Sequence, residues 1–345
     1  MKKPQRYRLE FDDWLPKRPQ KIKRERILVT VCIAAISKNI VPTDPGLMVI
    51  GATDRMLTGG DIEFEPKLAN KIVHFSTAIS GMFAGDFGLQ TEIIRSVLPI
   101  VQDRIKAEPL TWWKVEDVAK LYSVFLKKVH LQRSENAILA PYGLDINTFI
   151  SKQKDMHWEL VKQLASKLAQ FEAPSVQAIF CGHDLTGAHI YVVDNSANVI
   201  CHDVVGFAAI GAGYWHADSQ FMFAEHNPFK SFAETLLLTY SAKKHAEVAP
   251  GVGEDTDMFL IGPVLGSCVP NVGEHVLEKL EKTYQTNQKR KLQIDLRSQA
   301  ELGKYIGETI KKSAAPNQQE PTSPSSTNEP PPPDEQSPPS DEKRD

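Results

Sequence analysis

Residues 30–36 read TVCIAAI and open a run of four short apolar segments on which the fold prediction depends. The other three are GLMVIGAT at 46–53, NKIVHF at 70–75 and AISGMFAG at 78–85. All four are rich in β-branched side chains and are separated by turn-forming residues, a pattern typical of β-strands. We predict that they form an antiparallel meander. Polar residues then lie at strand ends, where their side chains can leave the sheet.

Helical and strand patterns alternate along the rest of the chain. Apolar residues at three- and four-residue steps, and a capping box at Ser231, predict helices over 90–99, 115–129, 158–168, 231–247 and 274–289. Turn-bounded apolar runs predict strands over 176–182, 189–194, 199–202 and 257–261, the first three as a second meander. This order favours an α+β fold in which two sheets are each covered on one side by helices, a four-layer αββα sandwich.

The composition indicates a soluble protein with one sizeable core. The chain has 345 residues, 41% of them hydrophobic, and a formal net charge of −3. Without a basic surplus, a nucleic acid is not an expected partner. No run approaches the roughly 18 apolar residues that would cross a membrane. The four cysteines lie far apart in the sequence, which fits a cytoplasmic protein with free thiols.

Neither a metal nor a cofactor is expected. The histidines include no H-E-x-x-H spacing that would bind a metal. Gly251 and Gly253 follow a predicted helix and precede a predicted strand, whereas a phosphate-binding loop precedes a helix. We therefore interpret these two glycines as part of a turn.

Composition divides the chain into three parts. Residues 1–29 are basic and interrupted by prolines, so we interpret them as an N-terminal extension, either a solvated arm or a removable propeptide. Residues 30–312 hold the predicted domain, with a helical insertion near 131–172. Over residues 313–345, proline, serine and charged residues leave little apolar surface to offset the entropy of ordering, which predicts a disordered tail.

The polar residues of the first four segments occur in a distinctive order. Thr30 heads the first segment in the pattern threonine-x-x-aliphatic-alanine. Asp54 follows the second segment, with Thr58 four positions later, and Lys71 precedes an aliphatic residue in the third. Gly85 ends a phenylalanine–alanine–glycine turn that begins twelve positions after the lysine. Over roughly residues 30–262, this ordered set resembles the proteasome β-subunit family of N-terminal nucleophile hydrolases, including its bacterial branch.

The resemblance implies the αββα fold and a threonine-type peptidase or amide hydrolase acting in protein breakdown. Its substrate would be a peptide or protein, and it would work as a homo-oligomer or ring. Thr30 would be the nucleophile after removal of residues 1–29. Lys71 would supply positive charge, Asp54 would orient Lys71, and the N–H of Gly85 would be the oxyanion donor.

These residue types suit such chemistry. A threonine hydroxyl is a weak nucleophile until a base takes its proton. A free α-amine, with a reference pKa of about 7.7–8.0, can be that base. Cys32 is a second candidate nucleophile, because it lies two residues after Thr30 and shares its strand face. The alternative interpretation of Cys32 is a buried small hydrophobe.

Four residues depart from the family pattern. Val29 stands where processed subunits usually carry glycine, and Ala212 stands where they usually carry serine. Glu247 and Pro250 fall near the positions of a supporting aspartate and serine. These differences favour a second hypothesis, a catalytically silent proteasome-fold protein that acts as a structural or interaction subunit. A third hypothesis is a small-molecule amidase of the same nucleophile class.

Overall fold

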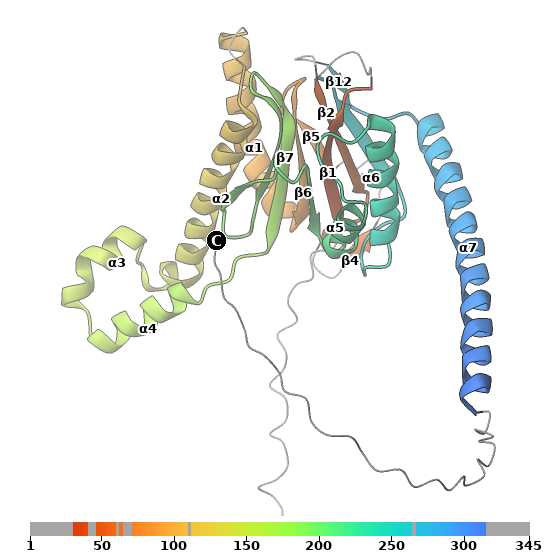
Figure 1. Ribbon diagram of the computed structural model, residues 1–345. Helices are drawn as coiled ribbons and strands as arrows, with labels where there is room; N and C mark the ends of the chain where they lie inside the picture. Colours follow the sequence, from red (N-terminus) through yellow and green to blue (C-terminus); the bar gives the residue numbers. More distant parts are fainter. Residues whose placement is uncertain are drawn as a thin grey trace, which may run out of the picture. The chain divides into compact units, whose positions relative to one another are not determined.

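The computed structural model describes residues 30–40, 46–59, 62–64, 71–109, 112–263 and 267–314. It shows a mixed α/β fold with two five-stranded antiparallel sheets and a separate pair of short strands (Figure 1). The described residues up to Thr286 form one compact unit, and those from Asn287 form another. The predicted extension 1–29 lies outside the described residues, as does the predicted tail from residue 315 onward.

The two sheets are built from strands that are distant in sequence. The first has the order β10–β1–β2–β11–β12 and contains β1 (Val31–Lys38), β2 (Leu47–Asp54), β10 (Phe207–Gly211), β11 (Thr256–Ile261) and β12 (Cys268–Val269). The second has the order β5–β6–β7–β8–β9 and contains β5 (Ile72–His74), β6 (Ile79–Gly85), β7 (Val176–Asp184), β8 (Gly187–Val193) and β9 (Val199–Cys201). The separate pair is β3 (Leu57–Gly59) with β4 (Ile62–Phe64).

Most of the helices lie between strands in sequence, and the last one follows the final described strand. They are α1 (Phe87–Ala107), α2 (Val115–Ile138), α3 (Ile146–Lys152), α4 (Trp158–Ala169), α5 (Tyr214–Phe223), α6 (Phe232–Ala246) and α7 (Glu274–Ala314). In Figure 1, α1 and α2 lie beside the second sheet, and α5 and α6 lie beside the first. Within the described ranges, no helix combines the length and the apolar character that a membrane crossing requires.

The predicted meander of the first four segments is wrong. β1 and β2 pair in the first sheet, whereas β5 and β6 pair in the second. The other edge of β2 pairs with β11, which comes much later in the chain. Local apolar patterns identify strands, but the choice of partner depends on packing between distant segments. The second predicted meander is confirmed, because β7, β8 and β9 are neighbours in that order.

Alternate side chains of β1 enter different apolar clusters. Cys32 packs with residues of the second sheet, among them Met82 of β6. Val31 packs instead with residues of α5 and α6, among them Phe221. A separate cluster packs α1 and α2 against the second sheet. Because side chains alternate along a strand, Thr30 shares the side of Cys32 and faces the second sheet.

Several elements differ from the sequence prediction. The prediction lacks α3, α5 and β12, and the helix predicted over 274–289 continues to Ala314. The start of α6 is confirmed, since the Ser231 side chain accepts a hydrogen bond from the backbone N–H of Glu234. In the region of the predicted insertion near 131–172, a small core of its own forms from Leu139, Phe149 and Leu164.

Candidate active site

Thr30, Asp54 and Lys71 meet where the two sheets adjoin. Thr30 precedes β1, Asp54 ends β2, and Lys71 precedes β5 of the second sheet. The Thr30 hydroxyl donates to Asp54 Oδ1, and Lys71 Nζ donates to Thr30 Oγ1. Lys71 Nζ also lies 2.9 Å from Asp54 Oδ1. The three residues are only 1%, 0% and 8% exposed, so their polar atoms satisfy one another with little help from solvent.

The Asp54 carboxylate is fixed by backbone donors as well as by the trio. The N–H of Val31 donates to Oδ1 at 2.9 Å, and those of Met56 and Gly253 donate to Oδ2, each at 3.0 Å. An ionised carboxylate only accepts hydrogen bonds, so these donors use both of its oxygens and set its orientation. The Gly253 donor comes from the turn that precedes β11, which the sequence indicated only as a turn.

The backbone of Thr30 has an unusual conformation. Its φ is 148°, a value that β-branched residues rarely adopt and that costs conformational energy. Its carbonyl oxygen accepts a hydrogen bond from Gly213 N at 3.2 Å. Gly211 has a φ of 91°, and a Cβ placed there would overlap the Thr30 carbonyl oxygen. Glycine at position 211 is thus required for the chain to pass close behind Thr30.

We expect Gly211→Ala to displace Thr30 from Asp54 and Lys71. The added methyl group meets backbone, which cannot rotate away, and the residue keeps a positive φ. Strain and overlap together should lower the free energy of unfolding by on the order of 3 kcal/mol. Urea denaturation measures this loss. The control is Gly143→Ala, which also has a positive φ but has open space around its Cβ position. Equal losses in both variants would contradict a role for the overlap.

Gly85 is not joined to the trio by any hydrogen bond among the described residues. It ends β6 opposite Val176 of β7. The next residue, Asp86, donates its N–H to Ser175 O, and Val176 N donates to Asn195 Oδ1 instead of to β6. Pairs alternate along an antiparallel ladder, so Gly85 and Val176 form a pair without hydrogen bonds. The Gly85 N–H therefore points away from β7.

A second link between the sheets lies beside Thr30. Gln177 of β7 accepts a hydrogen bond from Gly211 N through its side-chain oxygen, at 3.1 Å. Its backbone oxygen accepts from Gln90 Nε2 at 3.0 Å, and Gln90 also bonds to Tyr122 of α2. A chain of polar contacts thus runs from α2 through β7 to the glycine behind Thr30. Gln177 could not be identified from the sequence, since a single glutamine in a strand matches no motif.

Two of the residues that depart from the pattern described above, Glu247 and Ala212, form no side-chain hydrogen bond to the trio among the described residues. Glu247 binds Lys243 at 2.6 Å and Lys244 at 2.8 Å, and no hydrogen bond in the described chain joins it to the trio. Ala212 lies between the two glycines behind Thr30 and has no side-chain polar atom. The hydroxyl that a serine would supply is therefore missing at this point.

Cys32 does not have the properties of a nucleophile. It is fully buried, and its Sγ lies 3.3 Å from Thr53 Oγ1 and 3.6 Å from Phe83 O. Burial raises the pKa of the thiol to about 12, although the nearby Lys71 partly opposes the shift. At neutral pH the sulfur keeps its proton, and only the thiolate attacks well. The interpretation of Cys32 as a buried small hydrophobe accounts for these contacts.

A second polar cluster surrounds His189 of β8. His189 Nδ1 lies 2.6 Å from Asp203 Oδ2, and Nε2 lies 3.2 Å from Asp184 Oδ1. The hydrogen bond to Asp203 is the main reason why the pKa of His189 is raised. Because both ring nitrogens lie against carboxylates, we interpret this cluster as a structural link between β8 and the residues around Asp184 and Asp203. Across the described residues, no three His, Cys, Asp or Glu side chains are arranged to hold a metal ion.

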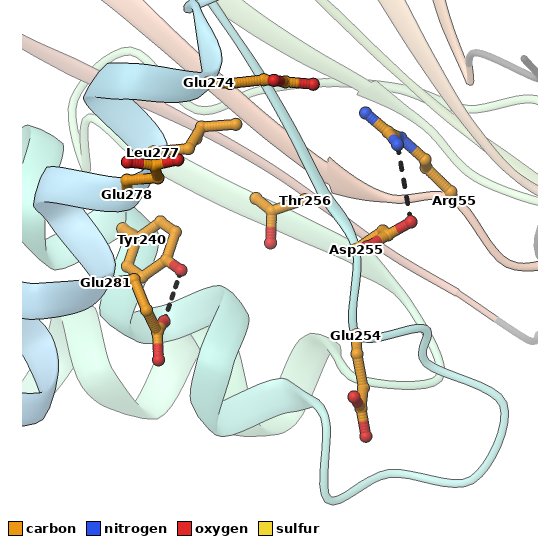
Figure 2. Close-up of a pocket in the computed structure, with 9 residues that line it drawn as sticks. All are labelled: Arg55, Tyr240, Glu254, Asp255, Thr256, Glu274, Leu277, Glu278 and Glu281. Atoms are coloured by element: carbon orange, nitrogen blue, oxygen red, sulfur yellow. Dashed lines mark hydrogen bonds and ion pairs between the residues drawn. The ribbon is translucent and has the colours of Figure 1, made fainter. Parts of the chain in front are cut away.

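A cavity of about 400 Å³ lies next to the residues that follow Asp54 and Gly253 (Figure 2). Figure 2 shows Arg55 paired with Asp255, and Tyr240 bonded to Glu281, on opposite sides of the cavity. The lining is mostly acidic and consists of Arg55, Tyr240, Glu254, Asp255, Thr256, Glu274, Leu277, Glu278 and Glu281. The cavity does not include Thr30 or Lys71, so it is separate from the trio.

No protein-family model matches this chain, and no curated protein matches it. The chemistry of the site therefore rests on its own contacts. A threonine hydroxyl is held between a carboxylate and an ammonium group, inside the protein, at the start of a strand. The ammonium group can stabilise negative charge on Thr30 Oγ1, and the carboxylate holds both the hydroxyl and the ammonium group in position.

Proposed function

We propose that this chain is an N-terminal nucleophile hydrolase of the proteasome β-subunit type, which cleaves amide bonds with Thr30. One observation carries the proposal. The Thr30 hydroxyl contacts both Asp54, 24 positions away in sequence, and Lys71, 41 positions away. An isolated aspartate–lysine pair is usually a modest ion pair. A buried pair that holds a hydroxyl on the residue just before a strand is better explained by catalysis.

The proposed reaction begins when residues 1–29 are removed. The freed α-amine of Thr30 takes the hydroxyl proton, and Oγ1 attacks the carbonyl carbon of the substrate. Lys71 stabilises the developing negative charge on Oγ1, and Asp54 keeps Lys71 in place. The amine product leaves with the proton, and the acyl group stays on Thr30 as an ester. Water then hydrolyses the ester and restores the hydroxyl.

The packing of the helices against the sheets supports a more specific description of the fold. One apolar cluster joins the two sheets, and two others join a helix pair to each sheet. We propose that these layers make the four-layer αββα sandwich of N-terminal nucleophile hydrolases. Gly85 N–H, which points away from β7, is the proposed oxyanion donor. The unfavourable φ of Thr30 also supports a special role for this residue, because strained backbone often occurs at active sites.

A second candidate function is a catalytically silent subunit with the same fold. Ala212 favours it, because no hydroxyl stands there to relay protons, and so does Glu247, whose carboxylate is engaged by two lysines. In the uncut chain the Thr30 nitrogen is an amide and cannot act as a base. A small-molecule amidase is a third candidate, which differs from the peptidase in substrate size.

Assembly and location are part of the proposal. Large apolar side chains on α5 are exposed, including Trp215 at 68% and Phe223 at 86%, and exposed apolar clusters often mark contacts between subunits. They support a homo-oligomer that processes peptides or proteins. The four free cysteines support a reducing compartment, and we propose the cytoplasm.

Mass spectrometry of the purified full-length chain tests the proposal. Under denaturing conditions, we expect the mass to fall by that of residues 1–29, and under native conditions we expect a homo-oligomer. The cleaved protein should release a fluorogenic amine from peptide amides. An uncut chain without turnover would favour the silent subunit. A cut chain that hydrolyses only small amides would favour the amidase.

A further inference from the structure

Lys243 is a charged side chain enclosed within the protein, away from the trio. It lies near the C-terminal end of α6 and is 0% exposed. Its Nζ donates to Glu247 Oε1 at 2.6 Å, to Gly253 O at 2.9 Å and to Glu254 O at 2.7 Å. A lysine ammonium has three N–H groups, and all three are used here. Enclosing such a charge is costly unless it is fully bonded, so its position is tightly specified.

The two carbonyl groups that Lys243 binds belong to the turn that orients Asp54. Gly253 accepts from Lys243 through its oxygen and donates its N–H to Asp54 Oδ2 at 3.0 Å. The same residue therefore joins the lysine to the carboxylate. Val252, one position earlier, packs in the apolar cluster that also contains Val31. The turn is thus held by the packing of Val252, by the bond from Gly253 to Asp54 and by the ammonium group of Lys243, which bonds to two consecutive carbonyl groups.

We infer that Lys243 is a positioning residue for the proposed hydrolase, because its ammonium group fixes the turn whose Gly253 N–H orients Asp54. The inference rests on the proposed function. Lys243 does not touch Thr30 or the substrate, so it acts only through Gly253 and Asp54. Losing it frees the turn and removes one of the two donors to Asp54 Oδ2. Asp54 then holds Lys71 less firmly against Thr30.

Lys243→Met tests this inference, because methionine has a similar length without the charge. We expect kcat, corrected for the folded fraction, to fall about 10- to 100-fold, the usual worth of a hydrogen bond to a charged group. KM should stay within about twofold, since no substrate contact changes. Amide hydrogen exchange at Gly253 and Met56 should become faster, which reports the freed turn directly without any turnover.

Lys244→Met is the matched control. Lys244 is the next residue on α6 and binds the other oxygen of Glu247, at 2.8 Å, but it has no bond to the 253–254 turn. We expect this variant to keep the kcat and the exchange rates of the unaltered protein. Equal effects in both variants would overturn the inference, because any charge removed near Glu247 would then suffice. Unchanged kcat and exchange in Lys243→Met would overturn it as well.

Glu247→Gln covers the case in which Lys243→Met does not fold. This variant keeps Lys243 but replaces its charged partner by a neutral amide. We expect faster exchange at Gly253 and Met56 and a drop in kcat of about three- to tenfold. No change in either measurement would again overturn the inference. If the unaltered protein has no turnover, the proposed function fails. The exchange comparison then still decides whether Lys243 holds the turn against Asp54.

Discussion

Thr30→Ala is expected to abolish both the removal of residues 1–29 and the turnover of amide substrates. The variant lacks the hydroxyl, and the nearest other candidate, Cys32, keeps its proton because burial raises the pKa of its thiol to about 12. Removing the nucleophile from a catalytic unit typically costs most of its rate enhancement, so we expect kcat to fall by at least about 10⁴-fold. Intact mass measures the cleavage, and release of a fluorogenic amine measures the turnover.

Thr30→Ser is the control for this prediction. Serine keeps a hydroxyl at the same atom position, so it should retain both cleavage and turnover at a reduced rate. Far-UV circular dichroism should match in the two variants, because neither change alters the strand. If Thr30→Ala remained active, the proposed nucleophile would be wrong, and a further Cys32→Ala change would show whether the sulfur is responsible.

Lys71→Met is expected to lower both activity and stability. The ammonium group is the only side-chain cation in contact with Thr30 Oγ1 and Asp54 among the described residues. Without it, kcat should fall roughly 10²- to 10³-fold, as when one stabilising donor is removed from a developing oxyanion. The Asp54 carboxylate would remain buried without its positive partner, which usually costs about 3–5 kcal/mol. Because the three backbone donors and the Thr30 hydroxyl still bind the Asp54 carboxylate, we expect the free energy of unfolding to fall by about 3 kcal/mol.

Lys38→Met is the control for the loss of a lysine. Lys38 is exposed at the other end of β1 from Thr30, so its replacement should leave activity unchanged and stability within about 0.5 kcal/mol. Urea denaturation gives the stability of each variant, and initial rates with a fluorogenic amide give the activity. Full activity in Lys71→Met would show that the ion pair is structural and that Lys71 takes no part in catalysis.

The trio could be predicted from sequence because its members stand at strand boundaries in a fixed order. A threonine before a strand, an aspartate after one and a lysine before the next are visible without a structure. The pairing of the strands was not visible. The pattern of 46–53 is the same whether β2 pairs with β11 or with β5, because both choices bury one face of the strand.

The contacts that hold the trio in place could not be predicted from the sequence, because many of them are made by backbone groups. Gly253 and Met56 contribute N–H groups to Asp54, and every residue except proline has one. Lys243 lies in an ordinary helical pattern, and nothing in its neighbours indicates that its side chain is enclosed. Only the structure shows that the Thr30 carbonyl closely approaches Gly211.

The contacts within the trio depend on the distance between the two sheets. Thr30 and Asp54 adjoin strands of the first sheet, and Lys71, which precedes β5 of the second sheet, bonds to both of them. Protein interiors are close-packed and transmit small displacements. A larger side chain between the sheets would move Lys71 relative to Thr30 while each sheet kept its own hydrogen bonds. In the proposed hydrolase, the rate of amide cleavage would then report the spacing between the sheets, including changes that leave the secondary structure intact.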